Sequence, residues 1–258
     1  MTRARLDQHF LADDAIASRI VAAADLRPGE DVVEIGPGRG ILTEKLLDTG
    51  ARVTAVELDD RLHAALAAKW KDRPDFRPVH ADFLKLDLGT LPSPAKFVAN
   101  LPYSVATPIL QLILPWPGWT TAVLMFQKEV AERIGAGAGS RKYGILSLSV
   151  AVHSDAYTLL DVPKRCFRPQ PQVDSAVVRF TRLERPRLPE GLAEKGFFKV
   201  VRAAFSQRRK MAANPLAGML GLDRAAVVAA MGRSGIDASA RAEDISLERF
   251  ILLARELI

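Results

Sequence analysis

The sequence has very little cysteine and no long apolar run. Its 258 residues include one cysteine, Cys166, which excludes an internal disulfide framework and a cysteine-based zinc site. We expect no metal centre, and a lone thiol suits a reducing cytoplasm. No stretch approaches the length of a membrane span, and acidic residues near the amino terminus interrupt any apolar run that could act as a signal sequence. A cytoplasmic protein without a membrane segment is expected.

The composition is that of a folded, basic protein. Hydrophobic residues make up 48% of the chain, which is enough for a full core at this length. Lysine and arginine together number 36 against 30 aspartates and glutamates, which gives a net charge of +6. An excess of this size permits a polyanionic partner, but it fits a merely soluble basic protein equally well.

Short apolar runs alternate with helical patterns over the first two-thirds of the chain. Residues 31–35 are mostly β-branched and lie between proline-glycine segments, which predicts a buried strand followed by a helix that stops at Gly50. This alternation indicates an α/β fold with a parallel sheet. Further strands are predicted at 52–57, 76–79, 97–99 and 122–126, and a further helix at 61–69.

The later part of the chain departs from this pattern. Residues 146–152 and 175–180 resemble strands without a crossover helix between them, so we expect them to pair as an antiparallel edge. Residues 185–191 are rich in proline and look like a linker, and helical patterns follow. We therefore predict two domains, residues 1–184 with the sheet and residues 185–258 as a small all-helical domain.

A glycine-rich motif occupies the first strand-to-helix turn, at residues 34–40. Its glycines allow the backbone to approach a ligand, and the following helix offers free N–H groups, so a nucleotide-like ligand is expected. Glu57 ends the next strand, where a carboxylate can hold both hydroxyls of a ribose. Ile41 stands where a dinucleotide fingerprint needs glycine, which disfavours NAD. The alternative is a glycine turn kept for packing beside an incidental surface glutamate.

The tetrapeptide Asn100-Leu101-Pro102-Tyr103 follows the predicted strand 97–99. The exocyclic amine of adenine is a poor nucleophile because its lone pair is delocalised into the ring. The Asn100 side-chain oxygen and a backbone carbonyl near Leu101 can each accept one N–H and turn the lone pair toward a methyl donor. Pro102 stiffens the turn, and Tyr103 offers a π-face to an extruded base. Alone, the tetrapeptide would more often be an ordinary turn, but its place after a fourth strand favours catalysis.

These segments together resemble the KsgA/RsmA family of ribosomal RNA adenine dimethyltransferases. The resemblance implies a class I methyltransferase sheet of Rossmann-like form, with S-adenosylmethionine as cofactor. It also implies dimethylation of N6 on two adjacent adenines in the 3′-terminal hairpin of small-subunit (16S) ribosomal RNA. The implied partner is this RNA within a pre-ribosomal small subunit, and the implied enzyme is a monomer. The matching segments are residues 8–11, 34–40, 57–59, 100–103, 127–130, 143–144 and 167–176.

The resemblance also assigns roles to residues. Asp82 falls where such enzymes place an acid that accepts a hydrogen bond from the cofactor's adenine, although alone it would more often be a turn residue or helix cap. Phe167 falls where an aromatic ring flanks the target base opposite Tyr103, or else it is a core aromatic. The implied cofactor contacts are Gln8, His9, Leu11, Gly36, Gly38, Glu57, Asp82, Phe83 and Asn100, and the implied catalytic residues are Asn100, Leu101, Pro102, Tyr103 and Phe167.

A basic segment near residues 203–210 matches a family helix. The predicted contacts to RNA phosphates are Lys199, Arg202, Arg208, Arg209 and Lys210, although a charge run is usually a solvated face. Two departures from the family stand out. Asp7 replaces the usual glycine, which predicts a different position of the N-terminal loop over the cofactor. Residues 211–213 lack the cation often found there, which predicts weaker binding of RNA through this segment.

Two other functions remain open at this point. Erm-type large-subunit ribosomal RNA methyltransferases share the chemistry but tend to have isoleucine at the position of Leu101. A non-catalytic RNA-binding assembly or transcription factor could keep the fold without the reaction. The intact set of Gly36, Glu57, Asp82, Asn100 and Tyr103 argues against it, because a retired site has no physical need for them.

Overall fold

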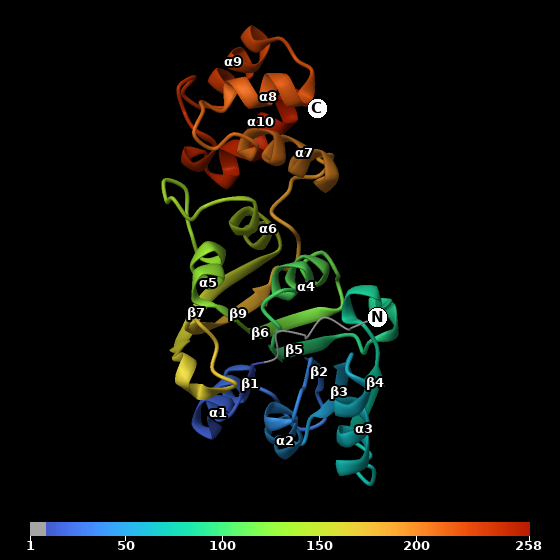
Figure 1. Cartoon of the computed structure of the whole chain (residues 1–258). Coiled ribbons are helices and arrows are strands. Elements are labelled where there is room, and N and C mark those ends of the chain that lie inside the picture. Colours follow the sequence, from blue (N-terminus) through green and yellow to red (C-terminus); the bar gives the residue numbers. More distant parts are fainter. Residues whose placement is uncertain (1–8) are drawn as a thin grey trace. The chain divides into compact units, whose positions relative to one another are not determined.

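The computed structural model describes residues 9–258 (Figure 1). The predicted cofactor contact Gln8 and the departure at Asp7 lie outside the described residues. The chain divides into two compact units. One holds the residues up to Ala131 together with Asp155–Arg182, and the other holds Glu132–Ser154 together with Leu183–Ile258.

The first unit is built on a seven-stranded sheet with the order β4-β3-β2-β5-β6-β9-β7. Strands β4, β3, β2, β5 and β6 are parallel to one another, and β9 is antiparallel to β6. The predicted mostly parallel sheet with an antiparallel edge is therefore confirmed. The strands are β2 (Asp31–Ile35), β3 (Arg52–Glu57), β4 (Phe76–His80), β5 (Ala95–Asn100), β6 (Trp119–Gln127), β7 (Ser154–Val162) and β9 (Ser175–Arg182).

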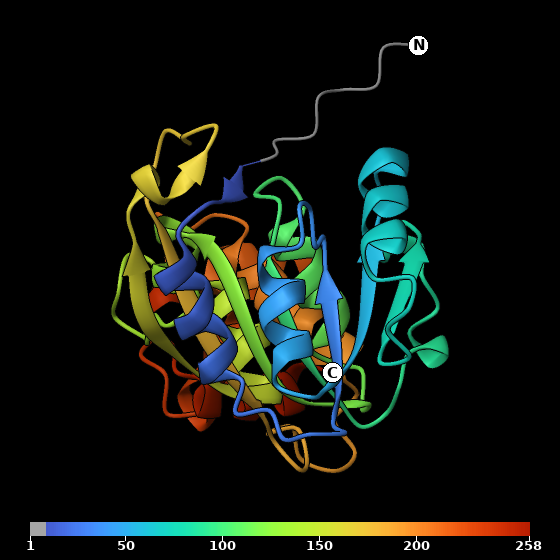
Figure 2. The same cartoon turned by 90° about the horizontal axis from the view of Figure 1, so that it is seen from below.

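Helices α1 and α2 cover one face of this sheet (Figure 2). Their buried residues, including Ile20 and Leu46, belong to one apolar core with Val32, Val98 and Val123 of the strands. Burial of such side chains is the main stabilising term of the unit. The helical segments of this part are α1 (Asp14–Ala23), α2 (Ile41–Asp48), α3 (Asp60–Lys69), η1 (Phe83–Lys85), η2 (Leu88–Thr90), α4 (Ala106–Ile113), α5 (Lys128–Ile134) and η3 (Lys164–Cys166).

A separate two-stranded sheet joins distant parts of the first unit. Strand β1 (Phe10–Leu11) pairs antiparallel with β8 (Phe167–Arg168), with Phe10 opposite Arg168 and Leu11 opposite Phe167. This pairing brings the beginning of the described chain to the segment that precedes β9.

Residues 146–152 do not form the predicted strand. They lie within helix α6 (Ile145–His153), and the strand beside β9 is β7. The helix is buried on nearly every side, so no polar face reveals a helical period in its sequence. Its start is marked by Ser147, whose Oγ accepts a hydrogen bond from the Gly144 N–H at 3.1 Å and donates one to the Arg133 carbonyl at 2.6 Å.

The second unit packs α6 with the helices that follow residue 183. Tyr143, Leu148 and Val152 share one core with Phe197 and Phe250. The predicted division after residue 184 differs from this arrangement. The prediction assigns residues 132–154 to the sheet domain, whereas in the structure they belong to the second unit. None of the described helices is long and apolar enough to cross a membrane. The later helices are α7 (Glu194–Phe205), α8 (Ala213–Leu220), α9 (Arg224–Arg233), η4 (Ala242–Asp244) and α10 (Leu247–Leu257).

Candidate functional site

A cavity of about 200 Å³ opens where the parallel strands of the first unit end. Parallel strands place their carboxyl ends on one edge, so the residues that follow β2, β3, β4 and β5 meet there. The structure brings the predicted site together, with the exceptions of Phe167 and of Gln8, which is not described. The predicted residues that line the cavity are His9, Leu11, Gly36, Gly38, Glu57, Asp82, Phe83, Asn100, Leu101, Pro102 and Tyr103.

Gly38 sits in the glycine turn where a side chain would be excluded. Its φ is +59°, and a Cβ atom there would lie 2.9 Å from the Phe10 ring. Both facts require glycine, because L-residues are strained at this φ and a carbon cannot approach so closely. The turn is therefore shaped jointly by its own sequence and by Phe10 from strand β1.

Glu57 holds the glycine turn from the neighbouring strand. The residue is only 5% exposed. Its Oε2 accepts a hydrogen bond from the Gly38 N–H at 3.0 Å, and its Oε1 accepts one from the Asp59 N–H at 2.9 Å. Each carboxylate oxygen can accept a second hydrogen bond. The fixed carboxylate can therefore also receive two hydroxyl donors from the cavity.

Glu34 also lines the cavity, and nothing in the sequence distinguished it beyond its place at the start of the glycine motif. It is 1% exposed and accepts a hydrogen bond from the Thr43 hydroxyl at 2.6 Å. Burial raises the pKa of Glu34 to about 8, with a smaller rise from the negative charge of Glu57. Glu34 is consequently mostly protonated at neutral pH. Glu57 differs from it in accepting hydrogen bonds from two backbone N–H groups.

Glu34→Gln is expected to lessen the loss of stability that occurs on raising the pH from 5 to 9. The native state binds the Glu34 proton more tightly than the unfolded chain does, because the pKa is raised. The contribution of Glu34 to the free energy of unfolding is therefore full below the ordinary pKa of 4.5 and is lost as the pH rises toward about 8. Thermal unfolding should be measured at pH 5, 7 and 9. Between pH 5 and pH 9, the melting temperature of the variant relative to that of the wild type should rise by on the order of 5–10 °C. Glu44→Gln, on an exposed face of α2, is the control. An unchanged difference across this range would mean that Glu34 is ionised in the native state.

Asp82 is a helix cap, which is one of its two expected roles, and it also lies at the cavity. Its Oδ1 accepts a hydrogen bond from the Leu84 N–H at 3.1 Å and caps the short helix η1, and its Oδ2 lies 3.6 Å from Lys85 Nζ. The side chain still lines the cavity. Phe83 is buried with its ring edge-on to Phe97 at 6.1 Å. The cap thus fixes the carboxylate at the cavity wall.

The turn of residues 100–103, for which the sequence predicts a catalytic role, follows β5 and is held by residues far away in sequence. The Asn100 Nδ2 donates to the His9 carbonyl at 3.1 Å, and no group within residues 9–258 donates a hydrogen bond to its Oδ1. Leu101 is 1% exposed, and no group within residues 9–258 donates a hydrogen bond to its carbonyl. A buried carbonyl of this kind is an acceptor that a ligand can satisfy. Both residues line the cavity, and each has an acceptor without a donor among residues 9–258.

Tyr103 is fixed at its hydroxyl and at its ring. The hydroxyl lies 2.7 Å from Ser175 Oγ, and the His9 ring stacks on the Tyr103 ring with centroids 5.7 Å apart. Burial raises the pKa of Tyr103, so the phenol stays neutral. Sequence reasoning did not single out Ser175 for this contact, although it lies in the matching segment 167–176.

Phe167 is placed differently from the prediction that it flanks a base opposite Tyr103. The residue is fully buried and packs in the same core as Leu11 and Ile20, and it does not line the cavity. Its pairing with Leu11 in the β1–β8 ladder turns it toward that core. The structure favours the alternative of a core aromatic, and the ring stacked on Tyr103 is that of His9.

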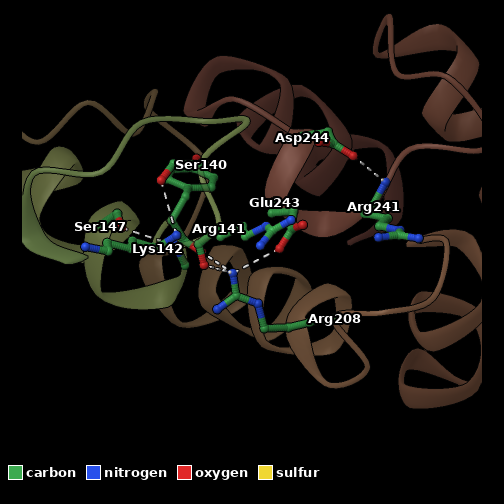
Figure 3. Close-up of polar contacts among 10 residues, drawn as sticks. Ser140, Arg141, Lys142, Ser147, Arg208, Arg241, Glu243 and Asp244 are labelled. Atoms are coloured by element: carbon green, nitrogen blue, oxygen red, sulfur yellow. Dashed lines mark hydrogen bonds and ion pairs between the residues drawn. The ribbon is translucent and has the colours of Figure 1, made fainter. Parts of the chain in front are cut away.

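The predicted basic cluster lies in the second unit and is less uniform than its sequence. Arg208 Nη2 donates to the carbonyls of Arg141 and Tyr143 at 2.9 and 2.8 Å and to Glu243 Oε2 at 3.0 Å (Figure 3). The Gly139 N–H donates to the Glu243 carbonyl at 2.7 Å. Arg208 therefore fastens the loop before α6 to the later helices. The other four residues are exposed without a side-chain partner among residues 9–258, and they are Lys199, Arg202, Arg209 and Lys210.

The family is decided by comparison of the whole chain with known proteins. A model of the family described as ribosomal RNA adenine dimethylase matches residues 1–258. The chain belongs to this family. Membership confirms the expected enzyme class and cofactor, an S-adenosylmethionine-dependent methyltransferase that acts on adenine of ribosomal RNA.

Named relatives extend over nearly the full length. The chain is 42% identical over 258 residues to ribosomal RNA small subunit methyltransferase A of Methylococcus capsulatus, covering 99% of this chain and 97% of that protein. It is 40% identical over 255 residues to the protein of the same name from Dehalococcoides mccartyi, covering 97% and 87%. These identities favour the small-subunit family over the Erm-type alternative.

Two solved structures share the fold. The 23S rRNA methyltransferase ErmE has a TM-score of 0.74 and 31% identity, covering 96% of this chain and 99% of that one. A dimethyladenosine transferase from Plasmodium falciparum has a TM-score of 0.81 and 24% identity, covering 95% and 96%. Class I methyltransferase architecture is thereby confirmed for this family member.

Proposed function

We propose that this protein dimethylates N6 of two adjacent adenines in the 3′-terminal hairpin of small-subunit ribosomal RNA. We propose further that it acts as a cytoplasmic monomer on a pre-ribosomal small subunit, where that RNA is found. The observation that supports the proposal is that Asn100, Leu101 and Tyr103 all line the cavity, while the Asn100 Nδ2 is engaged by the His9 carbonyl and Asn100 Oδ1 remains available to accept a hydrogen bond.

The cavity suits S-adenosylmethionine, a cation with a ribose diol and an adenine amine. Glu57 carries free lone pairs on both oxygens for the diol, and Asp82 is an acceptor on the wall for the adenine amine. The remaining lining is largely apolar, with side chains such as Leu11, Leu62 and Ile109. Carboxylates in such a setting interact strongly with a positive charge. When bound, this cofactor supplies an electrophilic methyl group on a cationic sulfur.

The residues of this chain then prepare the target amine. In the first of the two transfers, Asn100 Oδ1 and the Leu101 carbonyl each accept one N–H of the amine, which turns the nitrogen lone pair away from the ring plane and toward the methyl group. Tyr103 stacks on the extruded base and holds its plane. With the cofactor held at Glu57 and Asp82, its methyl group would be supplied to N6 and its sulfur would leave as a neutral thioether. The resulting cationic amine is acidic enough to lose a proton to water, so no general base is required.

The decisive experiment is transfer of labelled methyl groups to RNA, followed by mass spectrometry of the adenosines. The substrates are a small-subunit 3′-terminal hairpin, small-subunit particles from cells without the gene, and a large-subunit fragment. We expect dimethyladenosine in the particle. Light scattering separately tests the proposed monomer, for which we expect a protein mass near 28.2 kDa. A hairpin with the two adenines replaced by guanine is the control. Methylation of the large-subunit fragment alone would favour the Erm-type function, and no methylation with cofactor bound would favour an assembly factor.

We also propose that Lys199, Arg202, Arg209 and Lys210 contact RNA phosphates, with Arg208 mainly building the surface beneath them. Salt dependence is measured as the slope of the logarithm of the RNA-binding constant against the logarithm of the salt concentration. Replacing Arg209 and Lys210 by alanine should make this slope less steep by up to about 1.4, which is about 0.7 for each of two phosphate contacts. Cofactor affinity should not change. Arg208 is left intact because its removal would also release the loop before α6.

The matched control for this variant replaces Arg249 and Arg255 on α10, two exposed arginines, and so removes the same charge. Binding should be followed from low to moderate salt by fluorescence anisotropy of a labelled hairpin. Equal slopes for the two double variants would return Arg209 and Lys210 to the status of a solvated face.

A further inference from the structure

His9 is the residue in the described chain that contacts both halves of the turn of residues 100–103. Its carbonyl accepts the hydrogen bond from Asn100 Nδ2 at 3.1 Å. Its imidazole stacks on Tyr103 at a centroid distance of 5.7 Å and an interplanar angle of 30°, within the range of favourable aromatic pairs. One residue thus meets both the amide and the ring.

The imidazole of His9 is itself held in place. Its Nδ1 lies 2.8 Å from the Pro169 carbonyl. Because a carbonyl oxygen only accepts, Nδ1 carries the proton in this contact. The ring is therefore anchored on one side by Pro169 and on the other by its stack with Tyr103.

The backbone of His9 is fixed by the short strand that follows it. Phe10 and Leu11 pair with Arg168 and Phe167, and the Phe10 ring packs on Gly38. The Arg39 guanidinium also lies over the Phe10 ring, with its central carbon 4.6 Å from the ring centroid. These contacts leave His9 little freedom to move relative to the turn.

Tyr103 lies at the cavity and is held by one hydroxyl contact and one ring contact among the described interactions. Its hydroxyl is fixed by Ser175, but a hydroxyl contact alone leaves rotation about the ring axis. A second ring stacked on one face restricts that rotation and leaves the opposite face for an extruded adenine. The orientation of that adenine decides whether its amine meets Asn100 Oδ1 and the Leu101 carbonyl.

We propose that His9 is a positioning residue for methyl transfer, which acts by setting the plane of the Tyr103 ring. The inference rests on the proposed function, since it concerns the placing of adenine by the same turn. It goes beyond the cofactor contact expected at this position, because the ring of His9 acts on Tyr103 rather than on the cofactor alone.

The test compares three substitutions at His9. His9→Phe keeps a ring but loses the bond to Pro169, His9→Asn keeps a donor for Pro169 but loses the ring, and His9→Ala loses both. We expect His9→Ala and His9→Asn to lower the single-turnover rate of methyl transfer about tenfold, and His9→Phe to stay within about threefold of the wild type. The rates are compared at saturating S-adenosylmethionine, with the affinity of each variant measured by calorimetry, so that a weakened cofactor contact of His9 does not enter the comparison. His63→Ala, on α3, is the control.

A double-mutant cycle with Tyr103→Ala identifies the route of the effect. If His9 acts through Tyr103, the tenfold effect of His9→Ala should shrink to less than about twofold once the Tyr103 ring is absent. Independent, multiplying effects would overturn the proposal. So would a normal rate in His9→Asn with a slow His9→Phe, since that result would assign the role to the Pro169 bond. A wild-type protein that methylates no ribosomal RNA would instead refute the proposed function.

Discussion

Asn100→Ala is expected to lower the single-turnover rate of methyl transfer by about 10²–10³-fold while cofactor binding persists. The substitution removes the Oδ1 acceptor that orients the adenine amine, and removal of one preorganised hydrogen-bonding group from an active site has effects of this size. Glu57 and Asp82 remain to hold the cofactor. RNA affinity should fall only modestly, because the proposed phosphate contacts lie elsewhere in the chain. The measurement is transfer of labelled methyl to small-subunit particles at saturating cofactor.

The control for this prediction is Asn214→Ala, the same substitution at the chain's other asparagine, which bonds to Arg224 at 2.8 Å. Thermal unfolding should verify that both variants keep the fold. Near wild-type transfer by Asn100→Ala, with cofactor bound, would show that the turn is structural.

Tyr103 separates base placement from amine activation at the same turn. Tyr103→Ala should weaken transfer by loss of about 1–3 kcal/mol of base stacking, whereas Tyr103→Phe keeps the π-face and should keep much of the activity. The Phe variant also tests the bond to Ser175, which it removes.

Glu57→Ala is expected to raise the dissociation constant for S-adenosylmethionine by about 100-fold or more. Two charge-assisted hydrogen bonds to the ribose, at about 1.5–3 kcal/mol each, set the upper scale. The variant also loses the acceptors for the Gly38 and Asp59 N–H groups, so the glycine turn should become less rigid. Calorimetric titration gives the affinity.

Glu44→Ala serves as the matched control, because this exposed glutamate on α2 has the same charge and lies outside the cavity. Thermal unfolding of both variants separates loss of ligand contacts from loss of the fold. An unchanged cofactor affinity in Glu57→Ala would remove Glu57 from the binding site.

The parallel core and the cofactor turn could be predicted because their signals are local. Residues 31–35 and 52–57 are short and β-branched between turn residues, and they form β2 and β3 with those bounds. Gly38 is required in part by its own positive φ, which is a local property of the turn. The end of each parallel strand then fixes where Glu57, Asp82 and Asn100 meet, so order along the chain was enough to group them.

Other elements escaped prediction because their local signals are ambiguous. Residues 146–152 alternate in a strand-like manner, yet burial on nearly all sides makes them the helix α6. Their membership of the second unit depends on packing against Phe197 and Phe250, which no local pattern announces. The same is true of Arg208, which reads as part of a charge run but bonds to a loop some 65 residues away.

The sequence by itself determined the family and was enough to propose the glycine turn and residues 100–103 as site segments, because these depend on residue types at fixed spacing along adjoining segments. Only the tertiary structure decided that His9, 91 residues before Asn100, orients its amide, that Ser175 holds Tyr103, and that Phe167 belongs to the core. Contacts of this kind are set by how strands β1 and β8 close beside the sheet. Side-chain chemistry names the candidates, but the long-range packing of the backbone selects which of them meet.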